Sequence, residues 1–127
     1  NALNGYFDFV HNKKITITSY DFRKFFSEKQ YFKNDFVYLD PTYLITASEY
    51  NKFWDSKSES DLLNLIDNLD KRGVKFALSN VTHYNGSKND LLIEWMGQYK
   101  VHKIESNYIS YHNNGKKIIK EVLITNY

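Results

Sequence analysis

The sequence contains no cysteine, a single proline, five glycines and no long apolar run, and these shortages exclude several classes of protein. Without cysteine the chain cannot carry disulfides, thiol catalysis, iron–sulfur clusters or cysteine-ligated zinc. No apolar stretch approaches the roughly 20 residues that span a bilayer, and the N-terminus lacks the apolar region of a signal peptide. We therefore expect a soluble, cytoplasmic protein with no membrane partner.

The composition of the 127 residues is typical of one folded domain, with 42% hydrophobic residues, 25% charged residues and a net charge of +2. Aromatic residues make up 17% of the chain. They fill a core first, and stacking on nucleic-acid bases is the alternative. A basic excess in residues 98–127 indicates either a solvated face or a contact with a phosphate backbone. The chain begins with Asn1 rather than methionine, so we expect it to be a fragment of a longer protein.

Hydrophobic patterns predict alternating helices and strands. Apolar residues recur at helical spacing in residues 58–72, where Ser58 can cap the start and Gly73 can end the helix in the left-handed conformation. Shorter helices are expected at 21–26 and 90–95. Strands are expected at 14–18, 35–39, 74–78, 100–105, 108–111 and 118–125, with a hairpin turn at 112–115. This order predicts an α/β fold with an open, mostly parallel sheet and a C-terminal antiparallel hairpin.

The segment Asp40-Pro41-Thr42-Tyr43 directly follows one of these strands and holds the only proline. Proline lacks an amide hydrogen and cannot continue a central strand, so the strand ends there. Ligands of open α/β sheets bind beyond the carboxyl ends of the strands, which is where this segment lies. An aromatic cluster of Tyr50, Phe53 and Trp54 follows it. The segment is therefore the leading candidate for a functional site.

This segment resembles the catalytic motif D-P-P-Y of Dam-type adenine-specific DNA methyltransferases. The resemblance covers most of the chain: Gly5-Tyr6-Phe7-Asp8 is similar to the family's G-E-F-N, Ser79-Asn80 closes the next strand, and Glu121-Val122-Leu123 resembles the closing hairpin. It implies part of a Rossmann-like methyltransferase fold in a single domain, with residues 1–12 in the tail of the target-recognition region and 13–127 in the catalytic half. It also implies S-adenosylmethionine as methyl donor, double-stranded DNA as substrate, and the N-terminal half of the same protein as a partner.

The residue types suit that chemistry. Methylation of adenine's exocyclic amine needs acceptors for its protons, and Asp40 supplies a carboxylate while Pro41 supplies a rigidly placed carbonyl. Asp40 is also expected to contact the cofactor. Tyr43 offers a ring face to a base flipped out of the duplex. Thr42 replaces the family's second proline, and we interpret it as a tolerated variant beside the substrate.

Other candidates keep two interpretations. Tyr50, Phe53 and Trp54 either pack against the sheet or border the adenine pocket, with Tyr50 and Phe53 named as substrate-binding candidates. Lys116 and Lys117 are either solvated or reach a DNA phosphate. The four histidines show no metal-ligand spacing, so no metal is expected.

The glycine-rich cofactor loop of the family is absent, because the five glycines never form G-x-G. Most of the cofactor site is therefore expected to lie upstream, and the isolated fragment is expected to be inactive. The alternative function is a non-catalytic DNA-binding or assembly module. A protein-interaction domain with an accidental motif is a third interpretation.

Overall fold

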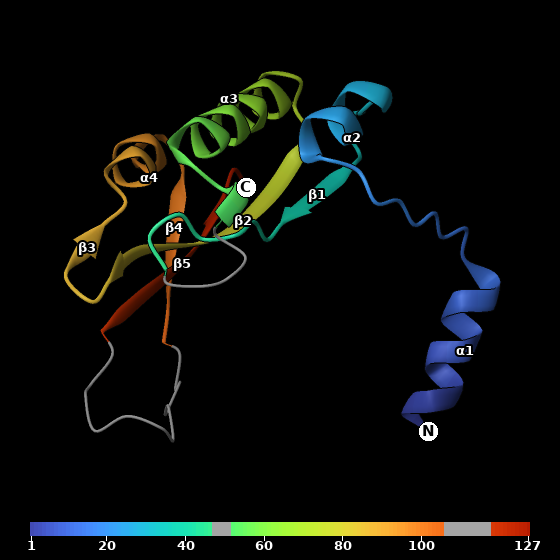
Figure 1. Cartoon of the computed structure of the whole chain (residues 1–127). Helices are drawn as coiled ribbons and strands as arrows, with labels where there is room; N and C mark the ends of the chain where they lie inside the picture. The colour runs from blue at the N-terminus through green and yellow to red at the C-terminus, as the bar shows by residue number, and fades with distance from the viewer. Residues whose placement is uncertain (47–51, 106–117) are drawn as a thin grey trace.

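A computed structural model describes residues 1–46, 52–105 and 118–127. It is a mixed α/β structure with one open sheet, and Figure 1 shows α2, α3 and α4 on one side of it. The elements in chain order are α1 (Ala2–Asn12), α2 (Phe22–Glu28), β1 (Phe36–Leu39), α3 (Ser56–Lys71), β2 (Lys75–Tyr84), β3 (Ser87–Lys88), α4 (Asp90–Trp95), the 3-10 helix η2 (Met96–Gln98), β4 (Lys100–Ile104) and β5 (Ile119–Thr125).

The sheet has the strand order β1-β2-β5-β4, and the short β3 pairs with β2. Only β1 and β2 are parallel, joined by the crossover helix α3. The other pairs, β2 with β3, β2 with β5 and β4 with β5, are antiparallel. The prediction of a mostly parallel sheet is therefore wrong. The physical reason is that β5 returns into the sheet between β2 and β4 and runs antiparallel to both.

Helix α3 confirms the strongest helix prediction but begins earlier than expected. Its N-cap is Asp55, whose Oδ1 accepts a hydrogen bond of 2.8 Å from the Ser58 backbone N–H, so Ser58 lies inside the helix. Gly73 ends the helix region with a φ of +75°, in the left-handed conformation expected of it. Because α3 ends there, the chain turns directly into β2.

The remaining predicted elements divide into three groups. Helices α2 and α4 and strands β1, β4 and β5 are confirmed to within a few residues. Strand β2 is longer than expected, so Ser79 and Asn80 lie inside it rather than at its end. The predicted strand 108–111 and turn 112–115 lie outside the described residues.

The N-terminal part of the chain differs from expectation. Residues 14–18 form no strand: this segment pairs with none of the described strands, and Ile17 is 90% exposed. Alternation of Ile and Thr suits a strand, yet a strand needs a neighbour for its backbone hydrogen bonds. Helix α1, which the sequence patterns did not predict, stands apart from the sheet in Figure 1 and has no buried residue.

The core lies between the sheet and its helices. Alternate residues of β1 follow this arrangement, because Val37 and Leu39 pack against the core while Tyr38 is exposed on the other face. The buried cluster joins β1, α3, β2, α4 and β5 through Leu39, Leu62, Leu63, Ile66, Phe76, Leu78, Leu92, Val122 and Ile124. This packing holds the carboxyl end of β1 in place. Within the described parts of the chain, no helix is long and apolar enough to cross a membrane.

Candidate active site

The candidate motif lies at the carboxyl end of β1, as its sequence position predicts. Leu39 is the last residue of the strand and is buried, Asp40 is exposed, and residues 41–46 are partly buried. Leu39 is paired with Leu78 in β2, so Asp40 follows the strand at the level of Ser79. On that face the Tyr38 hydroxyl and Ser79 Oγ share a hydrogen bond of 2.8 Å. The motif therefore follows a strand that is held by the core through Leu39 and by the Tyr38–Ser79 hydrogen bond on the opposite face.

Asp40 and Tyr43 are brought together within this loop. The Tyr43 hydroxyl donates a hydrogen bond of 3.2 Å to Asp40 Oδ1. The backbone carbonyl of Tyr43 accepts two hydrogen bonds from Thr46, one of 3.1 Å from the threonine hydroxyl and one of 3.3 Å from the threonine backbone N–H. These bonds close a turn that holds the tyrosine next to the carboxylate.

The acidity of Tyr43 reflects this environment. Several causes together raise the pKa of its hydroxyl to about 12: burial first, then the charge of Asp40 and the hydrogen bond to it, with smaller contributions from Glu121 and Tyr38. At neutral pH the group is therefore protonated and acts as a donor. Among the described residues, only Tyr43 donates a side-chain hydrogen bond to Asp40.

A pocket of about 330 Å³ opens beside Asp40 and Pro41. Its walls are mainly aromatic and aliphatic side chains, and Asp40 and Pro41 are among the lining residues. Such walls suit a flat, weakly polar ring whose exocyclic nitrogen needs acceptors. The lining residues, contributed mainly by α2, the segment before it and β1, are Thr18, Tyr20, Phe22, Phe25, Phe26, Val37, Tyr38, Leu39, Asp40, Pro41, Trp54 and Leu62.

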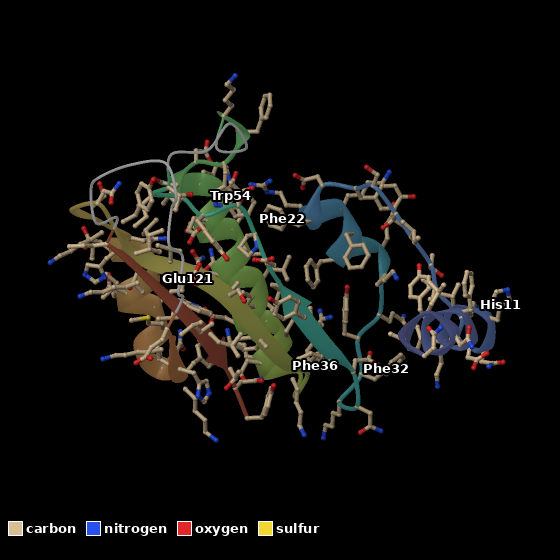
Figure 2. The ribbon with its side chains drawn as sticks, turned by 90° about the horizontal axis from the view of Figure 1, so that it is seen from below. His11, Phe22, Phe32, Phe36, Trp54 and Glu121 are labelled. Carbon is tan, nitrogen blue, oxygen red and sulfur yellow. The ribbon has the colours of Figure 1, made fainter. Side chains whose placement is uncertain are left out.

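Trp54 forms one wall of this pocket. Figure 2 shows its side chain beside that of Phe22, and the ring centroids are 5.4 Å apart with an interplanar angle of 49°. On its other side the indole Nε1–H donates a hydrogen bond of 2.7 Å to Glu59 Oε2. The wall is therefore held by a ring contact and a hydrogen bond.

The sequence-predicted residues meet different outcomes. Asp40 and Pro41 line the pocket, whereas Thr42 and Tyr43 are partly buried in the loop that follows and do not line it. Phe53 is 91% exposed and so does not pack against the sheet, whereas its neighbour Trp54 packs against the core. Tyr50, Lys116 and Lys117 lie outside the described residues.

Sequence reasoning missed two contributions to the pocket. One is the aromatic set in and just before α2, all of which lines the pocket: Tyr20, Phe22, Phe25 and Phe26. Their clustering at 20–26 is visible in the sequence, but nothing local says which of them turn toward Asp40. The other is indirect: Glu59, a buried charged residue of α3, does not line the pocket but accepts the hydrogen bond from its wall residue Trp54.

The described residues contain no group of three or more histidine, aspartate or glutamate side chains able to hold a metal ion. For a nucleotide-like cofactor the fit is partial. The pocket supplies apolar walls for a ring system and Asp40 supplies an acceptor, but the chain has no G-x-G loop for close backbone approach.

Comparison with known proteins identifies the family of the chain. The family model for D12 class N6 adenine-specific DNA methyltransferases matches residues 1–109. The type II methyltransferase M.FokI of Planomicrobium okeanokoites is 41% identical over 125 residues, covering 93% of this chain and 19% of that protein. The modification methylase StsI of Streptococcus sanguinis is 47% identical over 103 residues, covering 74% of this chain and 16% of that protein.

A third relative, the modification methylase LlaI of Lactococcus lactis subsp. lactis, is 36% identical over 106 residues, covering 77% of this chain and 16% of that protein. The chain therefore belongs to the D12 class of N6 adenine-specific DNA methyltransferases. It spans less than a fifth of the length of these curated relatives.

Proposed function

We propose that the protein takes part in the transfer of a methyl group from S-adenosylmethionine to the exocyclic amine of adenine in double-stranded DNA, as in restriction–modification systems. The observation that carries the proposal is that Asp40 and Pro41 follow the end of β1 and line an aromatic pocket, in a chain of this family. A cytoplasmic location, where DNA is accessible, belongs to the same proposal.

The residues of the loop have distinct roles in this proposal. The amine nitrogen of adenine is a weak nucleophile because its lone pair is delocalised into the ring. Asp40 and the carbonyl of Pro41 accept the two amine protons, which turns the lone pair out of the ring plane toward the methyl donor. As the new nitrogen–carbon bond forms, the amine becomes more acidic and Asp40 holds the proton that it loses. When bound, S-adenosylmethionine would supply an already activated methyl group, whose bond to the sulfonium sulfur breaks as the new bond forms.

Tyr43 and Thr42 act on the substrate side. In the proposal the ring of Tyr43 stacks on an adenine that has left the base stack, and its hydroxyl orients Asp40. Thr42 borders the base, and Tyr50 and Phe53 extend the contact. Lys116 and Lys117 bind DNA phosphate.

The organisation of the active protein is also part of the proposal. Residues 1–12 belong to the tail of the target-recognition region and residues 13–127 to the catalytic half of a Rossmann-like methyltransferase fold. Because the chain lacks a G-x-G loop, most of the cofactor site is supplied by the N-terminal half of the protein. Without that half the chain is inactive.

Transfer of labelled methyl groups to DNA by the protein as its gene encodes it tests the proposal. Asp40→Asn should reduce transfer to background, because the amide carries no negative charge and has one acceptor oxygen where the carboxylate has two. Its thermal unfolding should hardly change, since Asp40 is exposed. Glu94→Gln, which neutralises an exposed carboxylate on α4, is the matched control and should keep full activity.

The same assay separates the two candidate functions. A protein that binds DNA in a salt-dependent way but transfers no methyl group, with S-adenosylmethionine without effect on binding, is a non-catalytic module. An Asp40→Asn variant that transfers methyl groups as fast as the unchanged protein would refute the role of the motif.

A further inference from the structure

Glu59 is a fully buried carboxylate on the inner face of α3. Its Oε2 accepts a hydrogen bond of 2.7 Å from Trp54 Nε1. Its Oε1 accepts hydrogen bonds of 3.0 Å from Asn80 Nδ2 and 2.9 Å from Asn89 Nδ2. The three donors come from the segment before α3, from β2 and from the N-cap of α4. One side chain thus connects three separate parts of the fold.

A carboxylate in such a place needs a physical reason. Burial of a carboxylate is costly unless its oxygens are well bonded, and no cation within the described part of the chain pairs with Glu59. An apolar residue would fill the same volume without that cost. The carboxylate instead accepts directional hydrogen bonds, which fix each donor group at a defined position.

The two asparagines are themselves fixed, so the network is rigid on that side. Asn80 Oδ1 accepts the Val81 backbone N–H at 2.8 Å, and Asn89 Oδ1 accepts the Leu92 backbone N–H at 3.1 Å. Both amide groups therefore point their N–H atoms at Glu59. Their positions are set by β2 and by the start of α4, which leaves the Trp54 indole as the member that Glu59 positions.

Trp54 is also the member of this network that reaches the pocket beside Asp40 and Pro41. We infer that Glu59 is a positioning residue of the active site: by holding the indole of Trp54 against Phe22, it fixes the wall against which a purine ring lies when its amine reaches Asp40. This inference rests on the proposed function and adds to it a residue that does not itself touch the substrate.

The same helix provides a matched control. Asp67 Oδ1 accepts hydrogen bonds of 2.8 Å from Trp95 Nε1 and 2.7 Å from the Tyr99 hydroxyl. It is thus a second carboxylate of α3 that holds an indole, but neither Asp67 nor Trp95 lines the pocket. Loss of stability from a missing indole hydrogen bond should appear in variants of both Glu59 and Asp67. An effect on the pocket should appear only in variants of Glu59.

Glu59→Gln changes the network in a predictable way. Glutamine has one acceptor oxygen and one NH₂ donor, so it cannot accept from both sides. Asn80 and Asn89 cannot rotate without losing their own backbone bonds. The oxygen of Gln therefore faces them and its NH₂ faces the Trp54 indole N–H, a contact between two donors. The indole should leave its place.

Two measurements on the chain test this inference. In a Trp95→Phe background Trp54 is the only tryptophan, so Glu59→Gln should shift its fluorescence emission to longer wavelength. Adenosine, titrated while amide chemical shifts are followed, probes the pocket. Glu59→Gln should weaken adenosine binding about tenfold and Asp67→Asn less than about twofold, because only the former displaces a wall of the pocket.

A double-mutant cycle distinguishes positioning from general destabilisation. If Glu59 acts through the indole, Glu59→Gln should have less than about a twofold effect on adenosine binding once Trp54→Phe has removed the N–H. Equal losses in the Glu59→Gln and Asp67→Asn variants, or an undiminished effect in the Trp54→Phe background, would overturn the inference. Failure of the unchanged chain to bind adenosine would instead overturn the purine pocket, and this inference with it.

Discussion

Replacement of Tyr43 separates a role in the base pocket from a role in the fold. Tyr43→Phe keeps the ring and removes a hydrogen bond of 3.2 Å to an exposed carboxylate, a change of about 1 kcal/mol or less, so methyl transfer should fall by no more than about fivefold. Tyr43→Ala also removes the stacking face. This should cost roughly 1–3 kcal/mol, or a tenfold to hundredfold loss of transfer.

The structure sets the stability change that should accompany these losses. Truncation of a fully buried aromatic costs roughly 3–5 kcal/mol. Tyr43 is only partly buried and lies outside the core cluster, so Tyr43→Ala should cost clearly less, about 1–2 kcal/mol. Urea unfolding followed beside labelled methyl transfer measures both quantities in the protein as its gene encodes it.

Tyr99 supplies the control, because it also donates a hydrogen bond to a carboxylate but lies outside the candidate motif and packs against the core. Tyr99→Ala should lose stability first, and activity only as the fold is lost. If Tyr43→Ala lowers stability as much as Tyr99→Ala does, and transfer per folded molecule is unchanged, then Tyr43 is a structural residue and the stacking role is refuted.

Three further predictions follow from the local geometry. The pKa of Tyr43 is raised to about 12 from an ordinary 10.0, so the contribution of its hydroxyl to stability is complete below pH 10 and is lost as the pH rises through about 12. The difference in urea stability between the unchanged chain and Tyr43→Phe should therefore shrink between pH 10 and about 12. Gly73→Ala places a side chain at a φ of +75° and should cost roughly 1–2 kcal/mol in the same assay, although only Lys33 side-chain atoms lie near the new carbon; no loss would show that the turn relaxes. Asp55→Ala removes the hydrogen bond to the Ser58 N–H and should cost about 1 kcal/mol, which Asp55→Asn should largely restore.

Local patterns predicted the parts of the fold that depend on local physics. The helix α3, its glycine end and the end of β1 just before Asp40-Pro41 follow from side-chain periodicity, capping and the missing amide hydrogen of proline. The direction and neighbours of β5 do not. Its pairing with β2 and β4 brings together residues far apart in the chain. The local sequence patterns are compatible with several strand orders in the sheet, and only the packing of the core selects one of them.

The candidate site shows the same division, and Glu59 marks where a sequence signal was present but misread. It lies three residues before Leu62 and seven before Ile66, and so shares the face of α3 that enters the core. A reading that assigns charged residues to the solvent passes over it. A glutamate at such a position instead predicts a buried carboxylate that needs donors. Its donors could not be named from the sequence, because Trp54, Asn80 and Asn89 meet only after β2 and α4 have docked. The motif at Asp40 was recognisable because its residues are contiguous, whereas the wall that faces it is assembled by the fold.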